Sequence, residues 1–161
     1  MRALRSAVVL AVARPAAFVA LLAADRATKL WAMRDLRLSG PVTVLPFFEL
    51  SYVENTGAAF GVGHGANGFF IAVSIALIAI LVGLVRRWPK DDLWLQGGGL
   101  LVLAGALGNL YDRLFYRYVV DFLYVHHWPV FNVADSCITV GACLLAWRLK
   151  DDRAAAASGA P

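Results

Sequence analysis

The chain is 161 residues long, with 60% apolar and only 16% charged residues and a mean hydropathy of +0.66. Soluble domains are roughly 45–50% apolar, and the core of so small a soluble protein cannot hide the excess. We therefore expect the chain to lie in a membrane. The net charge of +4 does not indicate a nucleic-acid-binding protein, because the basic residues lie between apolar segments rather than along one face.

Four apolar stretches each approach the roughly 20 residues that a helix needs to cross a bilayer, where only a helix satisfies its own backbone. They occupy residues 15–33, 68–85, 94–110 and 130–147. The predicted fold class is an all-α membrane protein with four transmembrane helices, in a single domain over residues 1–150. Glycines at positions 97–99, 105 and 108 favour close packing of the third helix against a neighbour. The segment 151–161 is predicted to be a disordered cytoplasmic tail.

The basic residues predict the orientation of these helices. Most of them flank the helices on one side, namely Arg2, Arg5, Arg14, Arg86, Arg87, Lys90, Arg148, Lys150 and Arg153. The positive-inside rule places both termini and the loop after the second helix in the cytoplasm. A cleaved N-terminal signal peptide is an alternative, because Arg2 and Arg5 precede an apolar run. Since Arg14 and Pro15 interrupt that run, we favour a retained first helix.

The segments 34–67 and 112–129 then face outward. The first of them is rich in β-branched and aromatic residues and contains Pro41 and Pro46, which break helices. This composition predicts a small outward β-element at about residues 41–60, built from two short strands.

Polar residues within or beside the apolar stretches need a reason, since a charge in a membrane helix is costly. They gather toward the outer half of the predicted helices: Asp25, Lys29, Asn109, Asp112, Arg113, Asp121, Asn132 and Asp135. We expect them to meet in one polar pocket just below the outer surface.

Structural explanations compete with a functional one at several of these positions. Asp25 and Lys29, at i and i+4, suit an ion pair that braces the first helix or ties it to its neighbours, and we favour that role. Asp112 next to Arg113 suits a charge pair at a helix end. Asp135 would compensate the dipole at the start of the fourth helix. Two acids at one depth, Asp135 and the apolar-flanked Asp121, nevertheless favour a functional site.

Two carboxylates close together in a low-dielectric site cannot both ionise easily, so one keeps its proton. The ionised carboxylate can take a proton from a water molecule that attacks a peptide carbonyl, and the protonated one can protonate the leaving amine. Nearby Asn and Arg side chains would stabilise the developing oxyanion. Such chemistry needs neither a metal nor a nucleophilic side chain.

Other chemistries find less support. No serine has a spacing to a histidine that suggests a triad, and His64, His126 and His127 lack further ligands for a metal. Cys137 and Cys143 would point to different faces of one helix, as two buried thiols. We expect no metal and no cofactor.

Four sequence blocks, in this order, resemble lipoprotein signal peptidase (signal peptidase II). They are Asp25-Arg-Ala-Thr-Lys29, Glu54-Asn-Thr-Gly-Ala-Ala-Phe-Gly61, Gly105-Ala-Leu-Gly-Asn-Leu-Tyr-Asp-Arg-Leu114 with Val119-Val-Asp-Phe122, and Phe131-Asn-Val-Ala-Asp-Ser136. The resemblance covers about residues 15–150, and the order of the blocks together with the four-helix layout makes it specific. Ala104 stands where the family often has a further glycine.

The resemblance implies an aspartic endopeptidase that removes the signal peptide from diacylglyceryl-modified prolipoproteins, cutting before the lipidated cysteine. Asp121 and Asp135 match the catalytic aspartates of the family. The residues that match its substrate-binding or site-supporting positions are Asn55, Gly57, Asn109, Asp112, Arg113, Asn132, Asp25 and Lys29. The outer β-element resembles the cradle of the family. The implied setting is the bacterial inner membrane, with the site near the periplasmic face, membrane lipids as partners and a monomeric chain.

A different class of function is a proton- or ion-coupled transporter subunit, since intramembrane carboxylates also relay protons. A transporter predicts acids spread across the membrane depth and inverted repeats, whereas the acids here gather on one side and no repeat is visible. A non-catalytic membrane scaffold would tolerate the loss of both aspartates. The Gly-x-Gly-Asp motif of presenilin-like proteases is absent.

Overall fold

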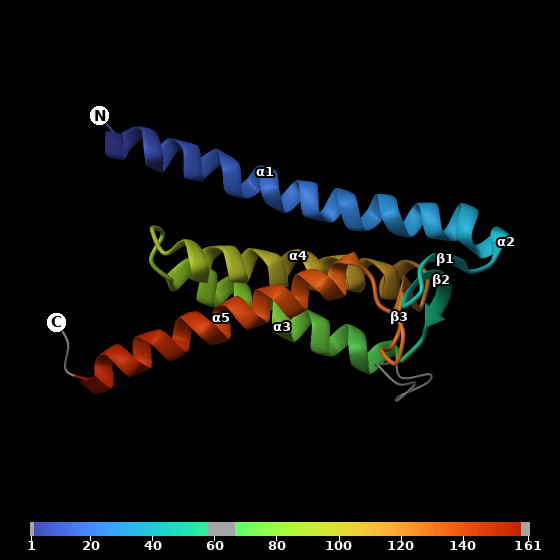
Figure 1. Ribbon diagram of the computed structural model, residues 1–161. Helices are drawn as coiled ribbons and strands as arrows, with labels where there is room; N and C mark the ends of the chain where they lie inside the picture. Colours follow the sequence, from blue (N-terminus) through green and yellow to red (C-terminus); the bar gives the residue numbers. More distant parts are fainter. Residues whose placement is uncertain (1, 58–66, 159–161) are drawn as a thin grey trace.

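The computed structural model describes residues 2–57 and 67–158 (Figure 1). Long helices run side by side between the two ends of the molecule, and a three-stranded sheet lies at one end. Both chain termini lie at the other end (Figure 1). The elements in chain order are α1 (Arg2–Trp31), the π-helical segment η1 (Ala32–Leu36), α2 (Arg37–Ser39), β1 (Val42–Leu45), β2 (Phe48–Asn55), α3 (Asn67–Arg87), α4 (Leu93–Phe115), β3 (Val119–Val125) and α5 (Val133–Ser158).

Each predicted apolar stretch is helical along most of its length. Within the described part of the chain, α3 and α4 are long and apolar enough to cross a membrane by length and composition. The helix α1 begins at Arg2, ahead of the first predicted apolar stretch, and continues through Pro15. The crossing of a bilayer by all of the long helices stays a prediction.

The C-terminal helix corrects one expectation. α5 continues to Ser158, so the prediction of a disordered tail is wrong for the backbone of residues 151–158. The physical reason is the alanine run of this segment, because alanine has the highest intrinsic helix propensity. Residues 159–161 lie outside the described part of the chain.

α4 and α5 pack closely because glycines remove side chains from their contact. A Cβ added at Gly105 would collide with the carbonyl oxygen of Ala134 and lie 2.8 Å from Cγ1 of Ile138. Farther along the same contact, a Cβ added at Gly141 would lie 2.7 Å from the carbonyl oxygen of Gly98. The predicted role of the glycines in close helix packing is therefore confirmed for Gly98 and Gly105. The contact at Gly105 brings the first turn of α5, which begins at Val133, against α4.

The β-element expected at residues 41–60 is present as β1 and β2, and residues 58–60 of that range lie outside the described part of the chain. The sequence did not predict the third strand, β3, which lies in a segment expected only to face outward and pairs antiparallel with β2. In this register Asp121 lies opposite Val53. Val120 and Phe122, on the other face of β3, pack against Ala32 and Leu36 of η1 and fix the sheet to the end of the first helix.

Candidate active site

Asp121 lies in the middle of β3 and is almost completely buried, with 1% of its surface exposed. Its Oδ1 accepts a hydrogen bond from Asn132 Nδ2 at 2.7 Å, and its Oδ2 accepts one from Asn55 Nδ2 at 2.8 Å. Asn55 reaches it because Val53 lies opposite Asp121, and the next residue on the same face of β2 is two positions later. Strand pairing thus positions this carboxylate.

Asp135 lies in the first turn of α5. Its Oδ1 accepts a hydrogen bond from Asn109 Nδ2 at 2.7 Å. Its Oδ2 accepts one from the backbone N–H of Asn132 at 3.2 Å, and the backbone N–H of Asp135 donates to Asn132 Oδ1 at 2.9 Å. This reciprocal pair has the form of a capping box. Asp135 therefore caps the start of α5, where a negative charge was expected to compensate the helix dipole. It also contacts Asn109 and Asn132, two of the other predicted site residues.

Asn132 brings the two carboxylates together. Its side-chain amide donates to Asp121, while its backbone N–H donates to Asp135. Burial and, next in size, the negative charge of Asp135 raise the pKa of the Asp121 carboxyl to about 7, while the hydrogen bonds from Asn55 and Asn132 act in the opposite direction. At neutral pH such a pair can hold one proton between two acids.

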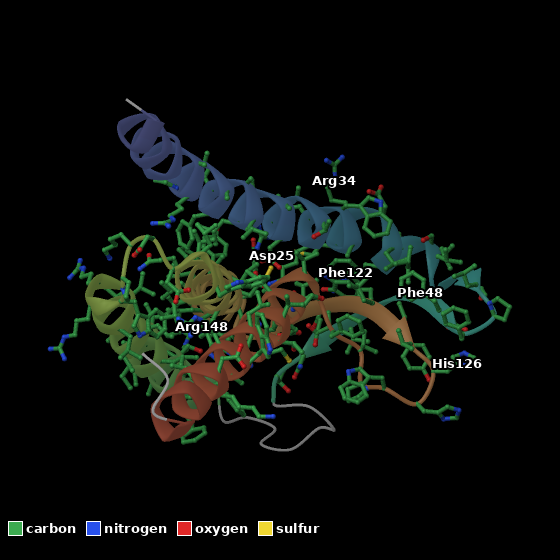
Figure 2. All side chains as sticks on the ribbon, turned by 60° about the vertical axis from the view of Figure 1, so that its left-hand side comes forward. Asp25, Arg34, Phe48, Phe122, His126 and Arg148 are labelled. Carbon is green, nitrogen blue, oxygen red and sulfur yellow. The ribbon has the colours of Figure 1, made fainter. Side chains whose placement is uncertain are left out.

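On the α1 side of the pair, the fully buried ammonium of Lys29 lies 3.0 Å from Asp25 Oδ2, Asp112 Oδ2 and Asn109 Oδ1. Asp25, which lies between α1 and the helices beside it (Figure 2), also accepts the backbone N–H of Ala134 at 3.0 Å. The ion pair within the first helix and the tie to its neighbours are thus both present. Asn109 contacts both Lys29 and Asp135. This cluster therefore holds Asp135 in position from the α1 side.

Asp112 does not form the helix-end pair with Arg113 that we considered as an alternative. Its carboxylate faces α1, where Arg26 Nη1 lies 2.7 Å from Oδ1, and its Oδ2 accepts the backbone N–H of Val120 at 3.2 Å. Asp112 therefore braces β3 against α1. Arg26 was not among the predicted site residues, although the sequence holds a signal for it, because a second cation near Lys29 in an apolar stretch also needs a partner.

Arg113 points the other way, toward α3. Its guanidinium lies 4.7 Å from the centre of the Phe70 ring, and its Nη2 donates to the carbonyl oxygen of Gly57 at 3.2 Å. The backbone N–H of Gly57 in turn donates to Asn55 Oδ1 at 3.0 Å. A continuous path of hydrogen bonds therefore runs from Arg113 to Asp121.

The histidines lie apart from this cluster. His126 lies at the tip of the loop after β3 (Figure 2), with its Nε2 3.7 Å from Glu49 Oε1. His64 lies outside the described residues. Within residues 2–57 and 67–158, no group of three or more His, Cys, Asp and Glu side chains is arranged to hold a metal ion.

Comparison with known proteins identifies the family of the chain. A family model described as signal peptidase (SPase) II matches residues 17–150, which include every site residue named above. The chain belongs to the signal peptidase II family. It is 44% identical over 138 residues to the lipoprotein signal peptidase of Clostridium acetobutylicum, covering 80% of this chain and 89% of that protein. It is 42% identical over 133 residues to that of Thermodesulfovibrio yellowstonii, covering 80% and 88%.

Solved structures agree with the family assignment. One bacterial membrane enzyme superposes with a TM-score of 0.81 at 28% identity over 88% of this chain and 89% of that chain. A second superposes with a TM-score of 0.73 at 32% identity over 85% and 92%. This member of the signal peptidase II family is thus a helical bacterial membrane enzyme with a small antiparallel sheet at one end. Membership of this family makes the chain an aspartic peptidase and not the transporter subunit considered as an alternative.

Proposed function

We propose that the chain removes the signal peptide from diacylglyceryl-modified prolipoproteins, cutting before the lipidated cysteine, with Asp121 and Asp135 as its catalytic residues. The observation that carries the proposal is the convergence on Asn132 of two carboxylates, the buried Asp121 and the half-buried Asp135. Membership of the signal peptidase II family supplies the substrate class, and the acid pair supplies the chemistry.

In the proposed reaction Asp121, whose pKa is raised to about 7 by burial and by the charge of Asp135, is the carboxyl that carries the proton, and Asp135 acts as the ionised base. Asp135 takes a proton from a water molecule as its oxygen attacks the scissile carbonyl. The proton of Asp121 goes to the amine that leaves when the carbon–nitrogen bond breaks. The products are the carboxylate of the signal peptide and the free amine of the lipidated cysteine.

The neighbouring polar side chains would hold this geometry. Asn55, Asn109 and Asn132 donate to the carboxylates and fix their direction. Arg113 is a buried cation that interacts electrostatically with both Asp121 and Asp135, and it is suited to stabilising a developing oxyanion. Lys29, Asp25 and Asp112 would be positioning residues, because their contacts are to one another, to the side chains of Arg26 and Asn109, and to the backbone of α5 and β3.

We further propose that α1, α3, α4 and α5 all cross the bacterial inner membrane within one domain, residues 1–150, with both termini in the cytoplasm. Two observations support this orientation. The sheet and the acids lie at the end opposite to the termini (Figure 1), and the basic residues Arg14, Arg86, Arg87 and Lys90 lie toward the terminal end. The site would then open near the periplasmic face, in contact with membrane lipids, in a monomer without a cofactor.

The test of the function is an assay of the purified protein on a diacylglyceryl-modified precursor and on the same precursor with an unmodified cysteine. We expect cleavage before the modified cysteine and little or none of the unmodified precursor, measured by mass spectrometry of both products. Equal cleavage of the two precursors, or cleavage of neither, would contradict the proposal.

A further inference from the structure

Two buried polar side-chain atoms lack a hydrogen-bond partner among the side chains that the structure describes, and both lie on the α3 side of the site. They are Nη1 of Arg113 and Oδ1 of Asn67. A buried polar group without a partner destabilises the folded protein and calls for an explanation. The α1 side offers a contrast, because Lys29 and Asp112 there have all of their charged atoms paired.

The orientation of the Asn67 amide is determined by its other contact. Asn67 Nδ2 donates to the backbone carbonyl of Arg113 at 3.1 Å, a carbonyl in the last turn of α4 that the helix itself does not satisfy. Since the nitrogen must face this carbonyl, the oxygen must point elsewhere. Capping of α4 therefore accounts for the hydrogen bond of Asn67 Nδ2, but it gives Oδ1 no partner.

The guanidinium of Arg113 is also held in one orientation. Its Nη2 is bound to Gly57, and its plane lies against Phe70. Phe70 follows Asn67 by three residues and so shares a face of α3 with it. The start of α3 thus presents a fixed acceptor beside a fixed, 9% exposed cation that has a free donor.

An unpaired donor and an unpaired acceptor, on two residues that are hydrogen-bonded to each other, match the carbonyl and the N–H group of a peptide backbone. This pair lies close to the proposed chemistry, because Arg113 is joined through Gly57 and Asn55 to Asp121 and interacts electrostatically with both catalytic acids. A substrate chain bound to these two atoms would therefore lie beside the acid pair.

We propose that Asn67 is a substrate-binding residue whose Oδ1 accepts a backbone N–H of the precursor, while Nη1 of Arg113 donates to a backbone carbonyl of the same chain. The precursor then lies on the α3 side of Asp121 and Asp135. This inference rests on the proposed peptidase function and adds to it the face on which the substrate binds.

The test combines Asn67→Ala with synthetic diacylglyceryl-modified precursors in which one peptide bond at a time, on either side of the scissile bond, is replaced by an ester. An ester lacks the N–H donor. We expect one ester position to lower kcat/KM of the unchanged protein about tenfold, the size of one hydrogen bond. Asn67→Ala should lower kcat/KM on the all-amide precursor by a similar factor, mainly through KM, and should be insensitive to that same ester.

Gly68→Ala is the matched control, because a Cβ at Gly68 meets nothing within 4 Å, and it should leave kcat/KM unchanged. If Asn67→Ala does not fold, Asn67→Ser, whose shorter side chain cannot keep both contacts, takes its place. The ester series on the unchanged protein needs no variant at all.

Three results would overturn the inference. The first is an ester series in which no position lowers kcat/KM, and the second is an Asn67 variant with unchanged kcat/KM. The third is an Asn67 variant in which each ester lowers kcat/KM by the same factor as in the unchanged protein. The last two are expected if a buried water bridges the two atoms and Asn67 only caps α4. In each case the unchanged protein still cleaves the all-amide precursor. Failure of the proposed function is distinguishable, since the unchanged protein would then cleave no lipidated precursor.

Discussion

Asn132 donates a hydrogen bond to each of the two acids. Its side-chain amide donates to Asp121, and its backbone N–H donates to Asp135. The separation of the carboxylates is therefore determined by the covalent geometry of a single residue and by the start of α5. A water molecule placed between them would meet two acids with unequal affinity for a proton, which is the condition for acid–base chemistry at neutral pH.

Asp121→Asn and Asp135→Asn should each lower kcat for a lipidated precursor by about 100-fold or more, because each removes one partner of the proton exchange. Asparagine keeps the size of aspartate, so both variants should elute and melt as folded protein. Asp35→Asn is the control, because Asp35 is an exposed acid on η1. Turnover near the unchanged level in either active-site variant would exclude the proposed mechanism.

The pKa of Asp121 predicts how activity depends on pH. Its proton is lost as the pH rises through about 7. Above that pH we expect kcat/KM to fall about tenfold per pH unit, because the acid that protonates the leaving amine has become ionised. A pH profile that is flat from 7 to about 9 would contradict this assignment.

The same raised pKa affects stability, with the opposite sign from an ordinary ion-paired carboxylate. The fold favours protonated Asp121, so this contribution to the free energy of unfolding is complete at acid pH and is lost as the pH rises through about 7. The melting temperature of Asp121→Asn should therefore depend less on pH than that of the unchanged protein, as a thermal-shift series would show.

At the scale of the elements, one buried cation joins α1 to α4. Lys29→Met should reduce the free energy of unfolding by about 3–5 kcal/mol, because it leaves the carboxylates of Asp25 and Asp112 buried without their shared partner. Thermal unfolding in detergent measures this loss. Arg34→Met removes an exposed cation on η1, directly after α1, and should have little effect. Similar losses in the two variants would show that Lys29 has no special structural role.

The α4–α5 contact allows a paired comparison of two glycines on one helix. Gly105→Ala should destabilise the protein by about 1–3 kcal/mol, because the new Cβ collides with Ala134. The shift of α5 should also lower activity by moving Asp135. Gly97→Ala meets nothing within 4 Å and should be neutral or slightly stabilising, since alanine favours the helix. Equal melting temperatures would mean that the contact tolerates a methyl group.

At the scale of the whole molecule, the separation of the sheet from the termini predicts which surfaces face the periplasm. In a chain whose two native cysteines are replaced by alanine, Phe47→Cys in the exposed turn between β1 and β2 should react with a membrane-impermeant thiol reagent added outside the cells. Arg87→Cys, at the end of α3, should react only after the cells are opened. Labelling of position 87 from outside would reverse the proposed orientation.

The sequence by itself determined the apolar helices, the outer β-element and the set of polar residues that gather near one end. Helix periodicity and the cost of a charge in lipid are local properties that can be read along the chain. The tertiary structure decided the partners: that Asp112 faces α1 while its neighbour Arg113 faces α3, that residues 119–125 form a strand, and that Asn132 joins the two acids. These features depend on contacts between segments that lie far apart in the chain, and strand formation depends on the neighbouring strand more than on composition.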